Sequence, residues 1–175
     1  MIFLTLLGFT WNAFAQGEAF NAGDRVINAG VGVGNYISYP NSSNKLFPIS
    51  ASFEYGVANL FDGIGAIGIG GYAAYTSFNH NNLPIGRNAI ISDFLVGPRV
   101  TFHYQFIVKL DTYIGGMIGY DVRSFPKLNF PMSGSKFCGI GFFGVRYYVT
   151  SDFAFFGEVG YEGVSPLQLG IAYKF

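Results

Sequence analysis

The sequence is poor in charge, in histidine and in cysteine. Asp, Glu, Lys and Arg make up 11% of its 175 residues, whereas soluble domains carry roughly 25%. The formal net charge is zero, which excludes the basic surplus expected of a nucleic-acid-binding protein. A single cysteine excludes an intrachain disulfide, and with only two histidines it gives no metal-binding motif, so we expect neither a metal nor another cofactor.

Apolar residues, aromatic residues and glycine are abundant instead. The chain is 50% hydrophobic and 19% aromatic, with 20 Phe and 12 Tyr, and 25 residues are glycine. This composition excludes a disordered chain, which would have few aromatic residues and high charge. The length suits a single domain. An ordinary soluble domain would need more charge than this to cover its surface, so the composition favours a domain that does not face water on all sides.

Residues 1–16 have the pattern of an export signal. An uncharged apolar run extends from Ile2 to Phe9, and the small residues Ala13 and Ala15 fit an A-x-A cleavage site. At about 1.5 Å per residue, a helix of about fourteen apolar residues reaches only about 21 Å, which is short of the roughly 30 Å core of a bilayer. We therefore expect a signal peptide over residues 1–16, cleaved near Ala15, rather than a membrane-spanning helix.

After the signal, apolar residues alternate with period two and no helical stripe persists. The long uncharged stretch between Asp62 and Arg87 could suggest a helix, but the glycines between Gly63 and Tyr75 would each be costly in a helix interior. Most alternating segments are about twice as long as a soluble strand of five or six residues, and this length suits a tilted membrane strand. The eight predicted strands cover residues 25–36, 47–58, 64–76, 90–103, 107–121, 137–149, 153–162 and 167–175.

The connections between these strands alternate between short and long. The short ones lie at residues 58–63, 104–106 and 150–152, and the long ones, rich in Asn, Ser, Pro and Gly, lie at 36–46, 77–89 and 122–136. An even number of strands with this alternation puts both termini and the short turns on the periplasmic side of an outer membrane. The sequence therefore predicts an all-β fold, an eight-stranded antiparallel up-and-down transmembrane β-barrel over residues 17–175.

One face of the strands carries nearly all their ions. A charge on the lipid face costs about 2–4 kcal/mol at the middle of the membrane, so we expect the apolar face outside and the polar face inside. Eight strands leave a lumen that side chains fill, so the inward ions should pair with one another rather than line a conduit. The expected lumen charge network is Glu54, Asp93, Arg99, Lys109, Asp111, Arg146, Glu158 and Lys174.

Turn positions predict two ion pairs within this network. If the turn after the fourth strand centres on Gln105, Arg99 lies opposite Asp111 as a cross-strand pair. A turn near residue 151 places Arg146 diagonal to Glu158. We expect a salt bridge in each pair.

Aromatic residues are expected to form two belts, one at each membrane interface. The outer belt is predicted to contain Tyr36, Tyr39, Phe47, Tyr75, Phe78, Tyr120, Phe125 and Phe137. The inner belt is predicted to contain Tyr55, Phe61, Tyr104, Phe106, Tyr147 and Phe153.

The end of the chain carries the most specific motif. Apolar or aromatic residues occupy every second position from Leu167 to Phe175, which looks like the C-terminal signature that the barrel-assembly machinery recognises, with Tyr173 and Phe175 as its assembly signal. Residues 144–153 and 156–161 resemble the late hairpin of small outer-membrane β-barrels of the OmpX and OmpA-barrel kind, and are similar to the porin-family barrel-domain proteins of Bacteroidetes-like bacteria. The resemblance implies this fold and a location in a Gram-negative outer membrane. We expect a monomer that the barrel-assembly machinery inserts and that contacts outer-membrane lipid and lipopolysaccharide.

Catalytic chemistry has little support in the sequence. A lipid-modifying barrel enzyme needs a nucleophile and a histidine close together. His80 lies in a long loop and His103 near the periplasmic end of a strand, and neither has a nucleophile partner that the sequence reveals. We therefore expect a protein that is not an enzyme, although a lipid-modifying enzyme remains a weaker alternative.

The long loops carry an excess of base over acid. They could face the anionic phosphates of lipopolysaccharide, or simply be solvated loops. The sequence favours a structural or surface-interaction role through these outer loops. The alternatives are a narrow porin-like channel for small solutes and a soluble ligand-carrying barrel of the lipocalin kind. The basic loop residues are Lys45, Arg87, Arg123, Lys127 and Lys136.

Overall fold

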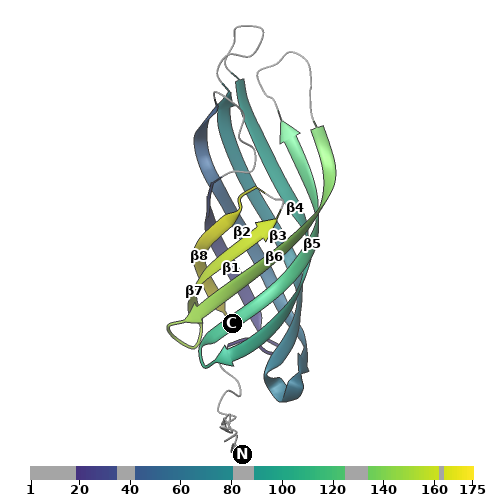
Figure 1. The fold of residues 1–175 in the computed structure, drawn as a ribbon, viewed down its shortest axis with the longest axis vertical. Helices are drawn as coiled ribbons and strands as arrows, with labels where there is room; N and C mark the ends of the chain where they lie inside the picture. The colour runs from purple at the N-terminus through teal and green to yellow at the C-terminus, as the bar shows by residue number, and fades with distance from the viewer. Residues whose placement is uncertain (1–18, 35–41, 81–88, 125–133, 162–163) are drawn as a thin grey trace, which may run out of the picture.

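The alternating segments form one closed antiparallel barrel in which every strand pairs with its neighbours in the chain and the last pairs with the first (Figure 1). The computed structural model describes residues 19–34, 42–80, 89–124, 134–161 and 164–175. The predicted signal peptide and its cleavage site lie outside these residues. The predicted fold class, an eight-stranded antiparallel up-and-down barrel, is confirmed.

Each predicted segment overlaps one strand, and the strand bounds shift by a few residues at the ends. Within the described residues, no helix is long and apolar enough to cross a membrane. A short 3-10 helix, η1 (Phe61–Gly63), forms the first tight turn. The strands are β1 (Arg25–Val33), β2 (Ser42–Leu60), β3 (Gly65–His80), β4 (Ala89–Ile107), β5 (Leu110–Ser124), β6 (Gly134–Tyr148), β7 (Phe153–Tyr161) and β8 (Leu167–Lys174).

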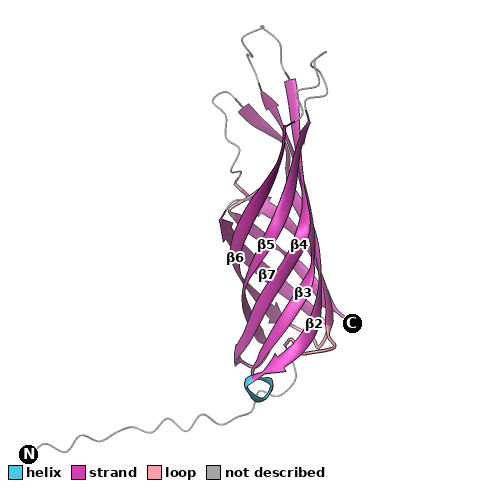
Figure 2. Cartoon of the chain, turned by 90° about the vertical axis from the view of Figure 1, so that its right-hand side faces the viewer, coloured by secondary structure: helices cyan, strands magenta, loops and turns pink. Residues whose placement is uncertain are grey.

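The barrel wall is high on one side and low on the other. β2 and β4 have 19 residues each, whereas β1 and β7 have 9 and β8 has 8. The pairing of β6 with β7 begins only at Gly141, so the first residues of β6 rise above the end of β7. We call β2–β6 the tall wall and β7, β8 and β1 the low wall. Figures 1 and 2 show the tall wall extending beyond the low wall at the end opposite the C-terminus.

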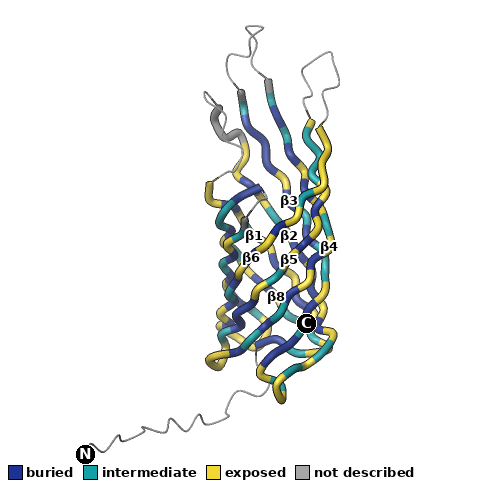
Figure 3. Tube along the Cα trace, turned by 45° about the vertical axis from the view of Figure 1, so that its right-hand side comes forward, coloured by how far each residue is buried: buried dark blue, intermediate teal, exposed yellow. Residues whose placement is uncertain are grey.

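The alternation of the sequence becomes an alternation of burial around the barrel (Figure 3). On β1, Ile27 and Val31 are exposed on the outside, while Val26 and Asn28 are buried inside. The same pattern places an apolar band over the whole outer surface, with Val100 on β4 and Ile114 on β5 as examples. The outer surface of the barrel is therefore apolar, and the interior contains buried charged residues together with two apolar clusters, unlike the polar outer surface and apolar interior of a soluble barrel.

The predicted aromatic belts are largely on the outer surface. Tyr55, Phe61, Phe106 and Tyr147 are exposed near the end with the short turns. Phe47, Tyr75, Tyr120 and Phe137 are exposed near the other end. Tyr36, Tyr39 and Phe125 lie outside the described residues. Phe78 departs from the prediction, because its side chain is 1% exposed and belongs to the interior phase of β3.

The turn between β4 and β5 differs from the predicted one. Ile107 pairs with Leu110, so the turn is formed by Val108 and Lys109, and a bulge between Tyr104 and Ile107 shifts the register. Lys109 adopts a positive φ of 67° and is exposed, so its prediction as a lumen residue is wrong.

This register also removes the first predicted ion pair. Arg99 lies opposite Met117 rather than opposite Asp111, so the predicted cross-strand pair is wrong. A two-residue turn placed further along the chain leaves these two side chains far apart along the hairpin.

Gly144 on β6 provides a test of how tightly the lumen is filled. A Cβ at this position would lie 2.2 Å from the ring of Tyr113, which is itself fully enclosed. We expect Gly144→Ala to lower the free energy of unfolding by about 1–3 kcal/mol because the ring has no room to move. Urea titration in detergent micelles, followed by circular dichroism, measures this.

The matched control is Gly139→Ala on the same strand, where an added Cβ would meet nothing within 4 Å. Equal stability of the two variants would show that the lumen has slack at Tyr113.

Candidate functional site

Arg146 is the centre of the lumen. Its side chain comes from β6, is 0% exposed, and donates hydrogen bonds from three nitrogens to three other strands. Nη1 lies 2.9 Å from Asp111 Oδ2 on β5, Nε lies 3.1 Å from Asn28 Oδ1 on β1, and Nη2 contacts Glu54 on β2. The planar guanidinium thus ties together strands from opposite sides of the barrel.

His103 on β4 completes this layer. Its Nδ1 lies 2.8 Å from Asp111 Oδ1, and its Nε2 lies 3.0 Å from Glu54 Oε1 and 2.9 Å from Thr101 Oγ1. Ionised carboxylates only accept hydrogen bonds, so a ring that contacts one carboxylate through each nitrogen needs a proton on both. The geometry therefore suits a doubly protonated, cationic His103.

A second ionic layer is built around Glu158 on β7. Arg99 Nη2 on β4 lies 3.0 Å from Glu158 Oε2, and the Tyr113 hydroxyl donates to the same oxygen at 3.1 Å. The Arg99 guanidinium also stacks over the Phe142 ring, 4.1 Å from its centroid. With a cationic His103, the charges of the two layers balance. The three acids are Glu54, Asp111 and Glu158, and the three bases are Arg99, His103 and Arg146.

The structure places the predicted network residues in different environments. Glu54, Arg99, Asp111, Arg146 and Glu158 are all buried in these two layers. Glu158 is diagonal to Arg146, as predicted, since Arg146 pairs with Phe156. Their predicted salt bridge is wrong, however, because Arg146 binds Glu54 and Asp111 and Glu158 binds Arg99.

The remaining network residues lie at the two ends. Asp93 is buried near the outer end, where Arg123 Nε lies 2.7 Å from its Oδ1. Lys174 lies at the inner end, with its Nζ 3.7 Å from Asp24 Oδ2.

Sequence reasoning missed four residues that take part in the layers. They occupy the same inward-facing alternate positions of their strands as the charged residues, and this alternation is the sequence signal that could have identified them. Their role depends on contacts across the lumen that a strand pattern does not contain. They are Asn28, Thr101, His103 and Tyr113.

His103 also has the neighbours of a hydrolytic triad, which the sequence did not reveal. Thr101 Oγ1 and Asp111 flank the two ring nitrogens, so the expectation that His103 lacks a hydroxyl partner is wrong. Thr101, however, already donates to Glu54, and all three side chains are almost fully buried. These contacts link β2, β4 and β5 inside the barrel. Among the described residues, no group of three or more His, Cys, Asp or Glu could hold a metal ion.

Both ends of the lumen are covered. At the inner end, the Phe20 ring stacks on His103 with 4.0 Å between ring centroids. At the outer end, Val164 in the β7–β8 connection is 3% exposed and packs with Tyr72 and Leu95.

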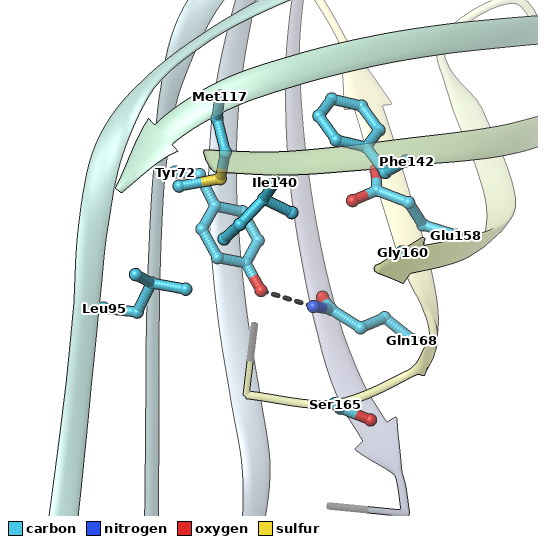
Figure 4. A pocket seen from close by; sticks show the side chains of 9 residues that line it. All are labelled: Tyr72, Leu95, Met117, Ile140, Phe142, Glu158, Gly160, Ser165 and Gln168. Atoms are coloured by element: carbon cyan, nitrogen blue, oxygen red, sulfur yellow. Dashed lines mark hydrogen bonds between the residues drawn. The ribbon is translucent and has the colours of Figure 1, made fainter. Parts of the chain in front are cut away.

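Between the outer cover and the ionic layers lies a small cavity (Figure 4). Met117, Ile140 and Phe142 give it an apolar wall, and Gln168 donates a hydrogen bond to the Tyr72 hydroxyl at its side. The described lumen therefore contains a small internal space above the ionic layers.

The predicted basic loop residues divide into two groups. Arg123 and Lys136 lie in β5 and β6 and not in a loop, so their prediction as loop residues is wrong; Arg123 binds Asp93, and Lys136, which is exposed, pairs in register with Asp121. Lys45 likewise lies in β2, and its side chain lies outside the described residues, as do Arg87 and Lys127.

The predicted assembly signal is on the outer surface. Tyr173 and Phe175 are both exposed, and Tyr173 pairs in register with Phe153 of β7 and Ile27 of β1.

The geometry defines a class of protein, a closed barrel with an apolar outer band and an ion-filled interior. No protein-family model matches the sequence, and a search by sequence found no similar curated protein. Solved structures do show the same fold.

One is Ail, the attachment invasion locus protein of Yersinia pestis, in complex with the heparin analogue sucrose octasulfate, at 13% identity and a TM-score of 0.58 over 88% of this chain and 99% of that chain. Another is the outer membrane protein OprG from Pseudomonas aeruginosa, at 13% identity and a TM-score of 0.59 over 90% of this chain and 98% of that chain. The chain therefore has the fold of small eight-stranded outer-membrane β-barrels, and identities this low show the fold alone.

Arg146 offers the sharpest test of the ionic layers. We expect Arg146→Met to lower the free energy of unfolding by about 3–5 kcal/mol, because Glu54 and Asp111 then lose their shared cation inside the lumen. The measurement is urea unfolding in detergent micelles.

Lys109→Met is the matched control, because Lys109 is exposed in the β4–β5 turn. This variant should change the free energy of unfolding by no more than about 0.5 kcal/mol. If Lys109→Met lowered the free energy of unfolding as much as Arg146→Met does, this would contradict the placement of Arg146 in the ionic layer and of Lys109 in an exposed turn.

Proposed function

We propose that the protein is a monomeric barrel of a Gram-negative outer membrane that acts by surface interaction through its outer end. The observation that carries this proposal is a tall wall that rises above the low wall, while Phe20 and Val164 are buried at the inner and outer ends of the lumen. The part of the tall wall above the low wall is the surface that we propose meets other molecules. The predicted export signal over residues 1–16 and the assembly signal at Tyr173 and Phe175 support the same route to the outer membrane.

The apolar outer band supports the location. Exposed large hydrophobic residues surround the barrel on all strands, and such a band would be unstable in water. The low wall, with 8 or 9 residues in each strand, is about as long as a tilted strand needs to be to cross the hydrocarbon core. The tall wall therefore has length left over to project from the membrane.

The basic residues predicted for the loops give the surface a candidate partner. We infer that Lys45, Arg87 and Lys127 contact lipopolysaccharide phosphates, because the other two predicted basic residues face the acids Asp93 and Asp121. The fold neighbour Ail was solved with a sulfated heparin analogue, which is also a polyanion.

A triple variant tests this partner. Lys45→Gln with Arg87→Gln and Lys127→Gln should weaken association with lipopolysaccharide micelles roughly tenfold or more at low salt, since each base near an anionic surface contributes about 1 kcal/mol. The difference should shrink as salt is added. Fluorescence titration with labelled lipopolysaccharide measures both effects.

Lys136→Gln is the control, because Lys136 lies opposite Asp121 in the pairing of β5 with β6. We expect this variant to bind as the unmodified protein does. Equal losses in the control and the triple variant, or no loss in either, would contradict the proposed partner.

The channel alternative predicts a different result in planar bilayers. With Phe20 below and Val164 above the ionic layers, we expect no single-channel conductance in concentrated potassium chloride. Regular conductance steps from the refolded protein would favour a narrow porin-like channel over the surface role.

A further inference from the structure

The inner end of the lumen holds a buried segment that is not part of the barrel wall. Residues 19–24 precede β1 and turn back under the ionic layers, with Ala19 1% and Phe20 4% exposed. Around them lies a ring of small or apolar inward side chains from several strands. This ring consists of Val26, Ala66, Tyr148, Ala154 and Ala172.

The Phe20 ring occupies a site with a defined chemistry. It stacks on the His103 imidazole at an interplanar angle of 27°, with 4.0 Å between the ring centroids. The Arg146 guanidinium lies 5.8 Å from the centre of the same ring. The His103 imidazole and the Arg146 guanidinium are cationic groups, and the π-face of an aromatic ring attracts cations. The site therefore favours an aromatic side chain over an aliphatic one. The small side chains around the ring leave space for its edge.

Backbone hydrogen bonds attach the segment to the barrel at residues 23 and 24 and not at Phe20. Gly23 N donates to Gly56 O at 2.8 Å, and Gly56 N donates to Asp24 O at 2.9 Å, which fixes the end of the segment to β2. Gly56 has to be glycine here, since a Cβ would lie 2.0 Å from Asn21 O. Gly23 itself has a φ of +95° and bends the chain back toward the lumen.

The buried end is held by the packing of Phe20 and by hydrogen bonds to side chains, with Ala22 N donating to Asn59 Oδ1 at 2.7 Å and Asn21 N donating to Asp24 Oδ2 at 2.9 Å. Lys174 Nζ donates to Ala19 O at 3.3 Å and lies 3.7 Å from Asp24 Oδ2. None of the pairings between strands includes residues 19–24. The buried end can therefore swing out about the turn at residues 21–24 while every strand pairing remains in place.

We propose that the inner mouth of the barrel is a binding site for an aromatic ring, filled by Phe20 of the chain itself, and that residues 19–21 are a plug that leaves and returns without unfolding the barrel. When the plug is out, solvent and small aromatic compounds reach His103 from the inner side. Val164 still covers the outer end, so the lumen becomes a pocket open on one side and not a channel. This inference does not depend on the proposed surface role.

Thiol accessibility at Ala66 tests the plug. Ala66 is fully buried beside Phe20, and Ala66→Cys in a Cys138→Ser background reports solvent that enters the inner mouth. In detergent micelles, a small charged thiosulfonate should label this cysteine at least about 100-fold more slowly than a cysteine at Val108 in the exposed β4–β5 turn, because labelling requires local opening.

Truncating Phe20 should remove this protection. Adding Phe20→Ala should speed the labelling at least about tenfold, and indole should slow it again by occupying the vacated site. Phe106→Ala is the control, since Phe106 is an exposed aromatic residue at the same end of the barrel, and it should leave the rate unchanged. Heat-dependent migration on a gel confirms that each variant is folded.

A second variant keeps the test valid if Phe20→Ala does not fold. Lys174→Gln retains the ring and removes the contact to Ala19 O, so it should speed the labelling several-fold. Fast labelling of Ala66→Cys in the protein with Phe20 in place, or an unchanged labelling rate in both variants, would overturn the proposal that residues 19–21 are a plug. Acceleration by Phe20→Ala that indole does not reverse would overturn the aromatic site.

Discussion

The narrow lumen of an eight-stranded barrel is the constraint on which the rest of this structure depends. Side chains fill such a lumen, so charged groups that point inward lose most of their contact with water and need partners within it. Arg146 meets this need by contacting Glu54, Asp111 and Asn28 at once. The interior is therefore an ionic core that links strands across the barrel, in the place where a soluble protein would have an apolar core.

The two ends of the molecule differ in structure because the barrel wall is asymmetric. The low wall is long enough to cross an apolar layer, and its β7–β8 connection brings Val164 over the lumen. The tall wall continues beyond this level. At the inner end, Phe20 packs against His103. The same contact therefore belongs to the ionic core and covers the inner mouth.

Reasoning from the sequence predicted which residues point inward more reliably than which residues meet. Arg99, Asp111 and Glu158 are all buried in the lumen, yet Arg99 binds Glu158 rather than the predicted Asp111. Turn positions predict ion pairs only between the two neighbouring strands of a hairpin. In a closed barrel, β4 and β7 face each other across the lumen, and long side chains reach partners there. The turn at Lys109 added a second error, because a left-handed residue and a bulge moved the register.

The sequence by itself determined the number of strands, their antiparallel order and the outward direction of the apolar face. These features follow from local properties, since a period of two and the positions of turn residues are written along the chain. Tertiary structure alone decided that His103 lies between two carboxylates, that Phe20 closes the inner mouth and that one side of the wall is taller. Each of these depends on the closure of β1 with β8 and on the exact register of each hairpin. Closure brings together residues that are distant in sequence, and no local pattern records that contact.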